Sequence, residues 1–120
     1  MNKYGAVLCQ GYGSKLEAAV GNVLRLRERA KEIFNVRRQH SVRLGSRYWK
    51  CDFSYEDIKT KETIWVEAKG LVIREFLWIK EMWKLIGPGT LEIWGGDYRR
   101  PYTIEIVEKG RFFKPGAGEQ

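Results

Sequence analysis

Three residues near the middle of the chain have the types and spacing that hydrolytic chemistry uses. Asp52 lies within one apolar run, and Glu67-Ala68-Lys69 closes the next run, 15 residues later. Side chains alternate along a strand, so Glu67 and Lys69 are expected on the same face. If the two runs pair as a hairpin around the polar loop at residues 56–61, Asp52 reaches the same point.

Two carboxylates and an amine gathered at one point predict a metal-dependent site. Carboxylate oxygens suit a hard divalent cation, and Mg²⁺ keeps several waters for substrate and nucleophile. We therefore expect Asp52 and Glu67 to bind Mg²⁺, or Mn²⁺ in its place, and Lys69 to hold a phosphate or orient a water. The alternative is that Glu67 and Lys69 form an ion pair on a solvated strand.

The first half of the chain predicts a helix and a hairpin. Ser14-Lys15-Leu16-Glu17 matches a capping box, and apolar residues follow at helical spacing to about Phe34. Residues 35–44 and 47–55 are expected to form strands joined by a Gly45-Ser46 turn. Four side chains of the first strand are expected on one face: Val36, His40, Val42 and Leu44.

The second half predicts a strand at residues 63–69, a helix at 72–86, and strands at 91–94 and 102–107. Residues 109–120 are expected to be a flexible tail. The helix is apolar beyond one face, which indicates either deep burial or a subunit contact. Three residues widen its apolar stripe in this way: Leu77, Trp78 and Leu85.

A lone Asp, a spacer and Glu-x-Lys on the following strand resemble the PD-(D/E)xK nuclease superfamily, although Cys51 rather than proline precedes Asp52. The resemblance covers residues 14–107. It implies an α/β fold with a restriction-endonuclease-like αβββαβ core, a central mixed sheet and one extra C-terminal strand. Within the superfamily, the compact size and the basic first half are most similar to archaeal-type Holliday junction resolvases, and the segments SKLEAAV and VEAKG resemble small phage-encoded nucleases. Together these features resemble a phage-encoded, archaeal-like Holliday junction resolvase.

The resemblance implies catalytic roles for Glu17, Asp52, Glu67 and Lys69, with the three acids at the metal. For Glu17 the alternative is that it only caps the first helix. Ser46 resembles the loop serine near the active site of these resolvases, and the alternative is a plain turn residue.

The function implied by the resemblance is Mg²⁺-dependent cleavage of branched double-stranded DNA, at paired phosphodiesters of a four-way junction, by a homodimer. Another phage nuclease of replication, repair or restriction-like function is the first alternative. A DNA-binding module without catalysis is the second.

Length and composition narrow the number of domains and the cellular setting of the protein. A length of 120 residues with 43% hydrophobic residues suits one domain over 1–120, with residues 1–13 as a leader. Cys9 and Cys51 are too few and too far apart for a zinc site or a disulfide framework, which favours a reduced, cytoplasmic setting. If the protein is phage-encoded, that setting is the host cytoplasm. No stretch is apolar enough to span a membrane.

The formal net charge of +7 is uneven along the chain. Residues 1–60 hold 12 Lys and Arg against 6 Asp and Glu, which favours a polyanion partner. His40 is the only histidine, so it cannot form a histidine metal cluster, and we expect it to be packed or to touch a phosphate. The candidate DNA-binding residues lie in a run without an acid: Arg37, Arg38, Arg43, Ser46, Arg47 and Lys50.

Overall fold

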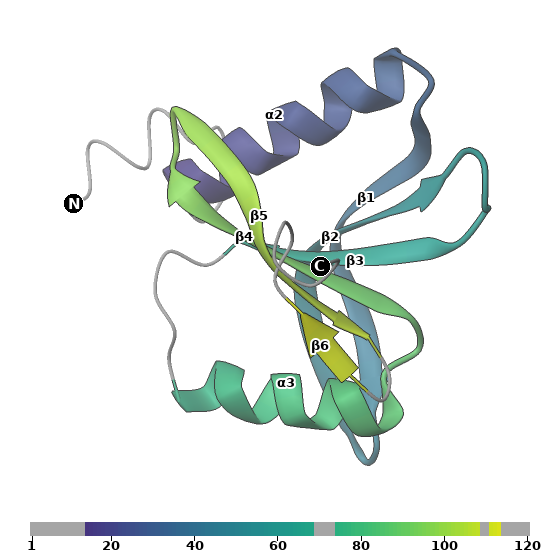
Figure 1. Cartoon of the computed structure of the whole chain (residues 1–120), viewed down its shortest axis with the longest axis vertical. Coiled ribbons are helices and arrows are strands. Elements are labelled where there is room, and N and C mark those ends of the chain that lie inside the picture. Colours follow the sequence, from purple (N-terminus) through teal and green to yellow (C-terminus); the bar gives the residue numbers. More distant parts are fainter. Residues whose placement is uncertain (1–13, 69–73, 109–110, 114–120) are drawn as a thin grey trace.

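The computed structural model describes residues 14–68, 74–108 and 111–113, and places two helices against a six-stranded sheet (Figure 1). In chain order the elements are α2 (Lys15–Arg29), β1 (Ile33–Leu44), β2 (Arg47–Asp57), β3 (Thr63–Ala68), α3 (Arg74–Ile86), β4 (Thr90–Asp97), β5 (Arg100–Glu108) and β6 (Arg111–Phe113). The predicted order of one helix, three strands, one helix and two strands is confirmed. The short strand β6 lies within the segment that was expected to be a flexible tail.

The sheet is mixed, as predicted. Its strands lie in chain order, and β3 pairs with β4 in parallel, whereas the other neighbours pair antiparallel. A parallel pair needs a crossover connection, and α3 supplies it between β3 and β4. The expected start of this helix at residue 72 lies outside the described residues.

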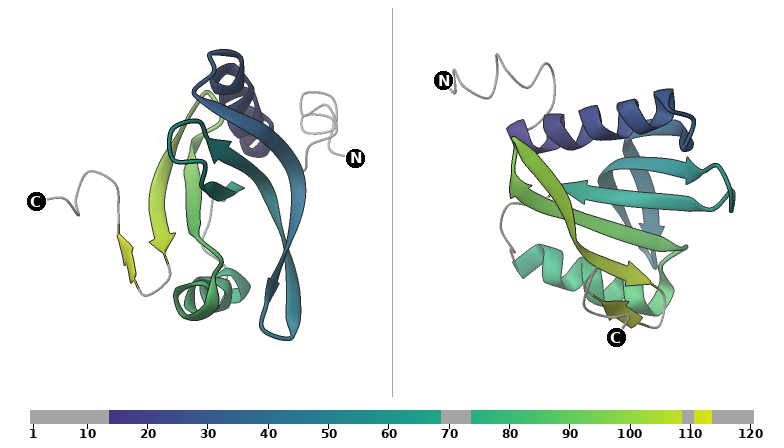
Figure 2. Two further views of the ribbon diagram at one scale, coloured as in Figure 1. Left: turned by 90° about the vertical axis from the view of Figure 1, so that its right-hand side faces the viewer. Right: turned by 45° about the horizontal axis from the view of Figure 1, so that its top comes forward.

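The two helices cover opposite faces of the sheet (Figure 2). On the α2 face the buried cluster consists of Val20, Leu24, Ile33, Phe53, Tyr55, Val66 and Trp94. On the α3 face it consists of Val42, Leu44, Cys51, Phe76, Ile79, Trp83, Leu91, Ile93 and Val107. Burying a large apolar side chain contributes about 1.5–3 kcal/mol, so both faces hold the strands in register.

Helix α2 ends earlier than its apolar spacing predicts. It begins after the N-cap Ser14 as expected, but it ends at Arg29 rather than near Phe34. Ala30 caps the helix, and Lys31 has a left-handed φ of 63°, which turns the chain into β1. Phe34 pairs with Glu56 of β2 instead, because its apolar side chain suits a strand as well as a helix.

The expected Gly45-Ser46 turn joins β1 to β2. Leu44 pairs with Arg47 across it, and Gly45 has a φ of 68°, as the first central residue of a type II′ turn requires. Glycine tolerates this conformation because it has no Cβ.

The expectation of one common face for the apolar side chains of β1 is wrong. Val36 packs with the α2 cluster, whereas Val42 and Leu44 pack with the α3 cluster. The reason is that β1 holds left-handed residues at Asn35 and Gln39, with φ of 57° and 55°. Such residues interrupt the strict alternation of a strand.

The apolar side chains of β2 also change from one face of the sheet to the other, opposite the irregular part of β1. Cys51 belongs to the α3 cluster, but Phe53, two residues later, belongs to the α2 cluster. In a regular strand these two side chains would share a face. The irregularity therefore falls on Asp52, the residue between them.

Strand β4 places a partly buried acid on the α2 side of the sheet. Glu92 Oε1 accepts hydrogen bonds from the Tyr55 hydroxyl and from Trp94 Nε1, each at 3.1 Å. Burial raises the pKa of Glu92 above its ordinary value, although the two donors and the charge of Arg27 act in the opposite direction. An ionised Glu92 therefore weakens the fold relative to a neutral side chain.

This burial predicts a pH-dependent effect of Glu92→Gln. Because the folded pKa is raised, the unfolded carboxyl loses its proton at a lower pH than the folded one, and wild-type stability falls as the pH rises through that window. Glutamine keeps an acceptor without a charge, so the variant should gain free energy of unfolding relative to the wild type between pH 4 and pH 8. Urea unfolding at both values measures this gain. A difference independent of pH, or one matched by the exposed control Glu81→Gln, would contradict it.

Candidate active site

Asp52 and Glu67 lie together where β2 and β3 stop pairing. The last regular pair of these strands is Phe53 with Val66, so Asp52 and Glu67 come next in register. Glu67 Oε1 accepts a hydrogen bond from the Asp52 main-chain N–H at 3.3 Å, and Asp52 Oδ2 accepts one from the Ala68 N–H at 2.9 Å. The two carboxylates thus replace the sheet hydrogen bonds and are fixed next to each other.

Burial of the residues around Asp52 and Glu67 limits which side chains can act as nucleophiles there. Glu67 is only 4% exposed, and Asp52 is half-buried. Burial, with the negative charges of Glu67 and Asp52, raises the pKa of the Cys51 thiol to about 12. Cys51 therefore stays a thiol at neutral pH, which excludes it as a thiolate nucleophile beside the carboxylates.

Glu17 reaches the same region through a residue that the sequence did not single out. Ser14 Oγ accepts a hydrogen bond from the Glu17 N–H at 3.0 Å, which confirms the N-cap. The Glu17 side chain is 7% exposed, and its Oε2 accepts a hydrogen bond from Gln39 Nε2 at 3.3 Å. Glu17 is therefore both next to the cap and directed at β1.

Gln39 occupies the register position opposite Asp52. Its neighbours Arg38 and His40 pair with Phe53 and Cys51, the residues on either side of Asp52. Counting back from the Gly45-Ser46 turn gives this position, and that is the one signal by which the sequence could have found Gln39. A left-handed glutamine is uncommon and marks a constrained position.

The donor set suits a hard divalent cation. Asp52 and Glu67 offer carboxylate oxygens only, and Mg²⁺ is usually held by one or two carboxylates together with waters and substrate phosphates. Within the described ranges, no three His, Cys, Asp or Glu side chains form a group that would hold an ion by itself. Two converging carboxylates meet the requirement of Mg²⁺ without a third.

The remaining predicted site residues fall into two groups. Lys69 lies outside the described residues. The candidate DNA-binding residues are all exposed on the β1–β2 hairpin: Arg37, Arg38, Arg43, Ser46, Arg47 and Lys50. Ser46 is six residues from Asp52, roughly 20 Å along β2 at the usual strand rise, so the structure does not bring it to the carboxylates.

Neither helix in the described ranges is long and apolar enough to cross a membrane.

Comparisons of the chain with protein-family models, with curated proteins and with solved structures found no match. The chemistry of the site itself is therefore the basis for a function.

The left-handed conformation of Gln39 predicts an unusual order of stabilities. Gln39→Gly and Gln39→Ala both remove the hydrogen bond to Glu17, but only glycine adopts a φ near 55° without strain. The glycine variant should therefore be more stable than the alanine variant by about 1 kcal/mol. Chemical unfolding of the two variants measures the difference. Equal stability, or a more stable alanine variant, would contradict the strained conformation.

Proposed function

We propose that this protein is a metal-dependent DNA endonuclease of the PD-(D/E)xK type, which resolves four-way junctions by paired phosphodiester cleavage. The observation that supports this most is the mutual fixing of Asp52 and Glu67 by main-chain hydrogen bonds at the separation of β2 and β3. A surface ion pair would leave Glu67 solvated, but its exposure is 4%. Burying acids is costly, and metal binding is one use that offsets the cost.

Each residue would have a separate role. Asp52 and Glu67 would hold Mg²⁺, and the bound ion would polarise a phosphate oxygen and favour ionisation of a water. Glu17 would act near the ion through a bound water rather than as a third direct ligand. Gln39 would position Glu17 through its amide. Lys69 would hold the phosphate or orient the attacking water. In the reaction the water oxygen bonds to phosphorus as one P–O ester bond breaks, and a proton passes to the leaving oxygen.

The β1–β2 hairpin would supply the DNA contact. Its cations are exposed, and residues 37–50 contain no acid. Arginine side chains match phosphate geometry, and neutralising phosphates releases counterions, which supplies affinity without reading base sequence. A protein that recognises branched DNA by shape needs a contact of this kind.

A homodimer is part of the proposal because two strands must be cut. Helix α3 buries Phe76, Ile79 and Trp83 but leaves a second set of large apolar side chains in solvent. These are Leu77, Trp78 and Leu85, at 48%, 36% and 66% exposure. Exposed apolar residues that gather on one helix suit a protein contact, and a two-fold dimer uses such a patch twice.

Cleavage of a supercoiled plasmid that extrudes a cruciform tests the proposal. Paired incision by a dimer should convert the plasmid directly to the linear form in the presence of Mg²⁺. Asp52→Asn and Glu67→Gln should lower the rate more than about 100-fold while junction binding persists, because each removes a charged metal ligand and keeps the side-chain shape.

Glu62→Gln is the matched control, since it neutralises an exposed carboxylate just before β3 and should leave the rate unchanged. Nicked circles without linear product would favour the alternative of a general phage nuclease. Binding without any Mg²⁺-dependent cleavage by the wild type would favour the non-catalytic DNA-binding module. Wild-type cleavage by either carboxylate variant would remove the assignment of the site.

A further inference from the structure

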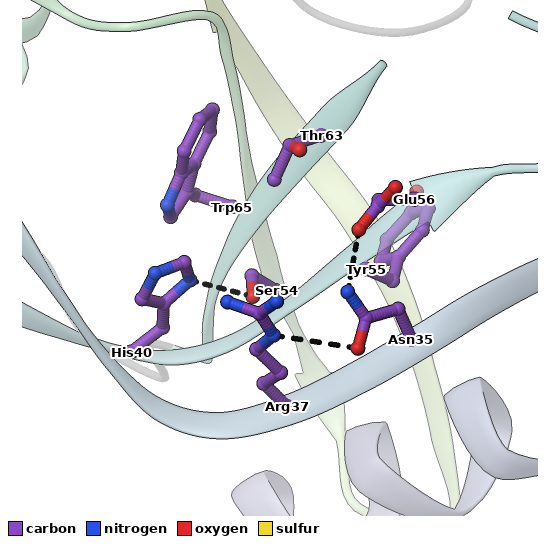
Figure 3. Close-up of a pocket in the computed structure, with 8 residues that line it drawn as sticks. All are labelled: Asn35, Arg37, His40, Ser54, Tyr55, Glu56, Thr63 and Trp65. Atoms are coloured by element: carbon purple, nitrogen blue, oxygen red, sulfur yellow. Dashed lines mark hydrogen bonds between the residues drawn. The ribbon is translucent and has the colours of Figure 1, made fainter. Parts of the chain in front are cut away.

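A small polar cavity lies next to the candidate active site. It has a volume of about 100 Å³, and its lining includes Asn35, Arg37, His40, Ser54, Glu56 and Trp65 (Figure 3). Ser54 is two residues after Asp52 on β2, and Trp65 is two residues before Glu67 on β3. At the usual strand rise the cavity is roughly 7 Å along each strand from the two carboxylates.

The indole N–H of Trp65 is an unused donor at this cavity. In the part of the chain that the structure describes, Trp65 Nε1 is the buried side-chain nitrogen or oxygen that lacks a hydrogen-bond partner. The Trp65 ring lies near those of Trp83 and His40, with ring centroids 5.5 and 6.2 Å away. Its nitrogen lies at the end nearest His40 (Figure 3). An unpaired buried donor is unfavourable, so an acceptor that reaches this N–H would be bound favourably.

Arg37 brings a cation to the same cavity. Its Nε donates to Asn35 Oδ1 at 3.4 Å, and Asn35 in turn donates to Glu56 at 2.5 Å, which turns the guanidinium toward His40 and Ser54 (Figure 3). The register shift of β1 between Phe34 and Arg37 produces this arrangement, because a bulge redirects the side chains that follow it.

His40 and Ser54 complete the polar wall. Ser54 Oγ lies 2.7 Å from His40 Nδ1, and both side chains can donate or accept. Burial and the nearby charge of Arg37 lower the pKa of His40, so the cavity holds the Arg37 cation and the acid Glu56 beside a neutral histidine. The acid in the lining, Glu56, is engaged by the amide of Asn35.

We infer that this cavity binds a phosphate group of the nucleic acid strand that enters the neighbouring site. A cavity that binds benzene measures about 150 Å³, so a cavity of about 100 Å³ is small for a nucleobase but adequate for a tetrahedral oxyanion. The guanidinium of Arg37 and the N–H of Trp65 are donors suited to phosphate oxygens. The choice of a nucleic acid over free phosphate rests on the proposed nuclease function.

The Trp65 indole signal in ¹H–¹⁵N NMR spectra of the full chain reports on the site directly. It can be assigned through its contacts with the rings of Trp83 and His40, so no Trp65 variant is needed. Three probes are added in EDTA: inorganic phosphate, a single-stranded oligonucleotide, and thymidine as the phosphate-free control. The Trp65 signal should shift saturably with the first two and remain in place with thymidine.

Two arginine variants supply the matched comparison. Arg37→Gln should weaken the response of Trp65 to inorganic phosphate by about 10-fold or more, as loss of a charged hydrogen bond does. Arg25→Gln removes the same charge from an exposed position on helix α2, outside the proposed DNA contact, and should leave that response unchanged.

Several results would overturn the inference: no shift with any probe, a shift with thymidine, or a response that survives Arg37→Gln. A response to inorganic phosphate but not to the oligonucleotide would make the cavity a free-phosphate site and overturn the nucleic acid assignment. The plasmid assay separates this question from the proposed function. Cleavage with an unresponsive Trp65 would refute the cavity assignment alone, and a responsive Trp65 without cleavage would refute the nuclease alone.

Discussion

The exchange of hydrogen bonds between Asp52 and β3 is the interaction on which the candidate site depends. Where β2 leaves β3, the main-chain N–H groups of Asp52 and Ala68 bond to carboxylates instead of carbonyls. Without these acceptors the two part-buried N–H groups would lose their hydrogen bonds, and without the N–H groups the carboxylates would lose charge-assisted hydrogen bonds. Strand geometry and negative charge therefore stabilise each other, and the clusters on both sheet faces prevent β2 from shifting.

Much of the fold could be predicted because its signals are local. A serine three residues before Glu17 fixes the start of α2, and Gly45-Ser46 fixes the hairpin and hence the register of β1 with β2. The end of α2 could not be placed, since Phe34 fits helical spacing and strand pairing equally well. The change of faces at Gln39 could not be predicted either, because a left-handed glutamine has no residue-type signal comparable to that of glycine.

Part of the candidate site could likewise be predicted from the sequence, and part could not. The meeting of Asp52 and Glu67 follows from strand alternation and a short hairpin loop, and the structure brings them together as predicted. The contact from Glu17 to Gln39 joins a helix to a strand 22 residues away, so no local pattern indicates it. The cavity at Trp65 depends on a bulge in β1, and a bulge is decided by the packing of both sheet faces rather than by the residues within it.

Paramagnetic broadening by Mn²⁺ tests the central claim most directly, because it needs neither DNA nor turnover. At substoichiometric Mn²⁺, the main-chain amide signals of Asp52 and Ala68 should broaden before others in the ¹H–¹⁵N spectrum. Asp52→Asn should abolish that selectivity at the same Mn²⁺ concentration, since an amide oxygen is a poorer ligand than a carboxylate for a hard cation. Broadening centred on exposed acids such as Asp97, or selective broadening that persists in Asp52→Asn, would contradict a metal site at the junction of β2 and β3.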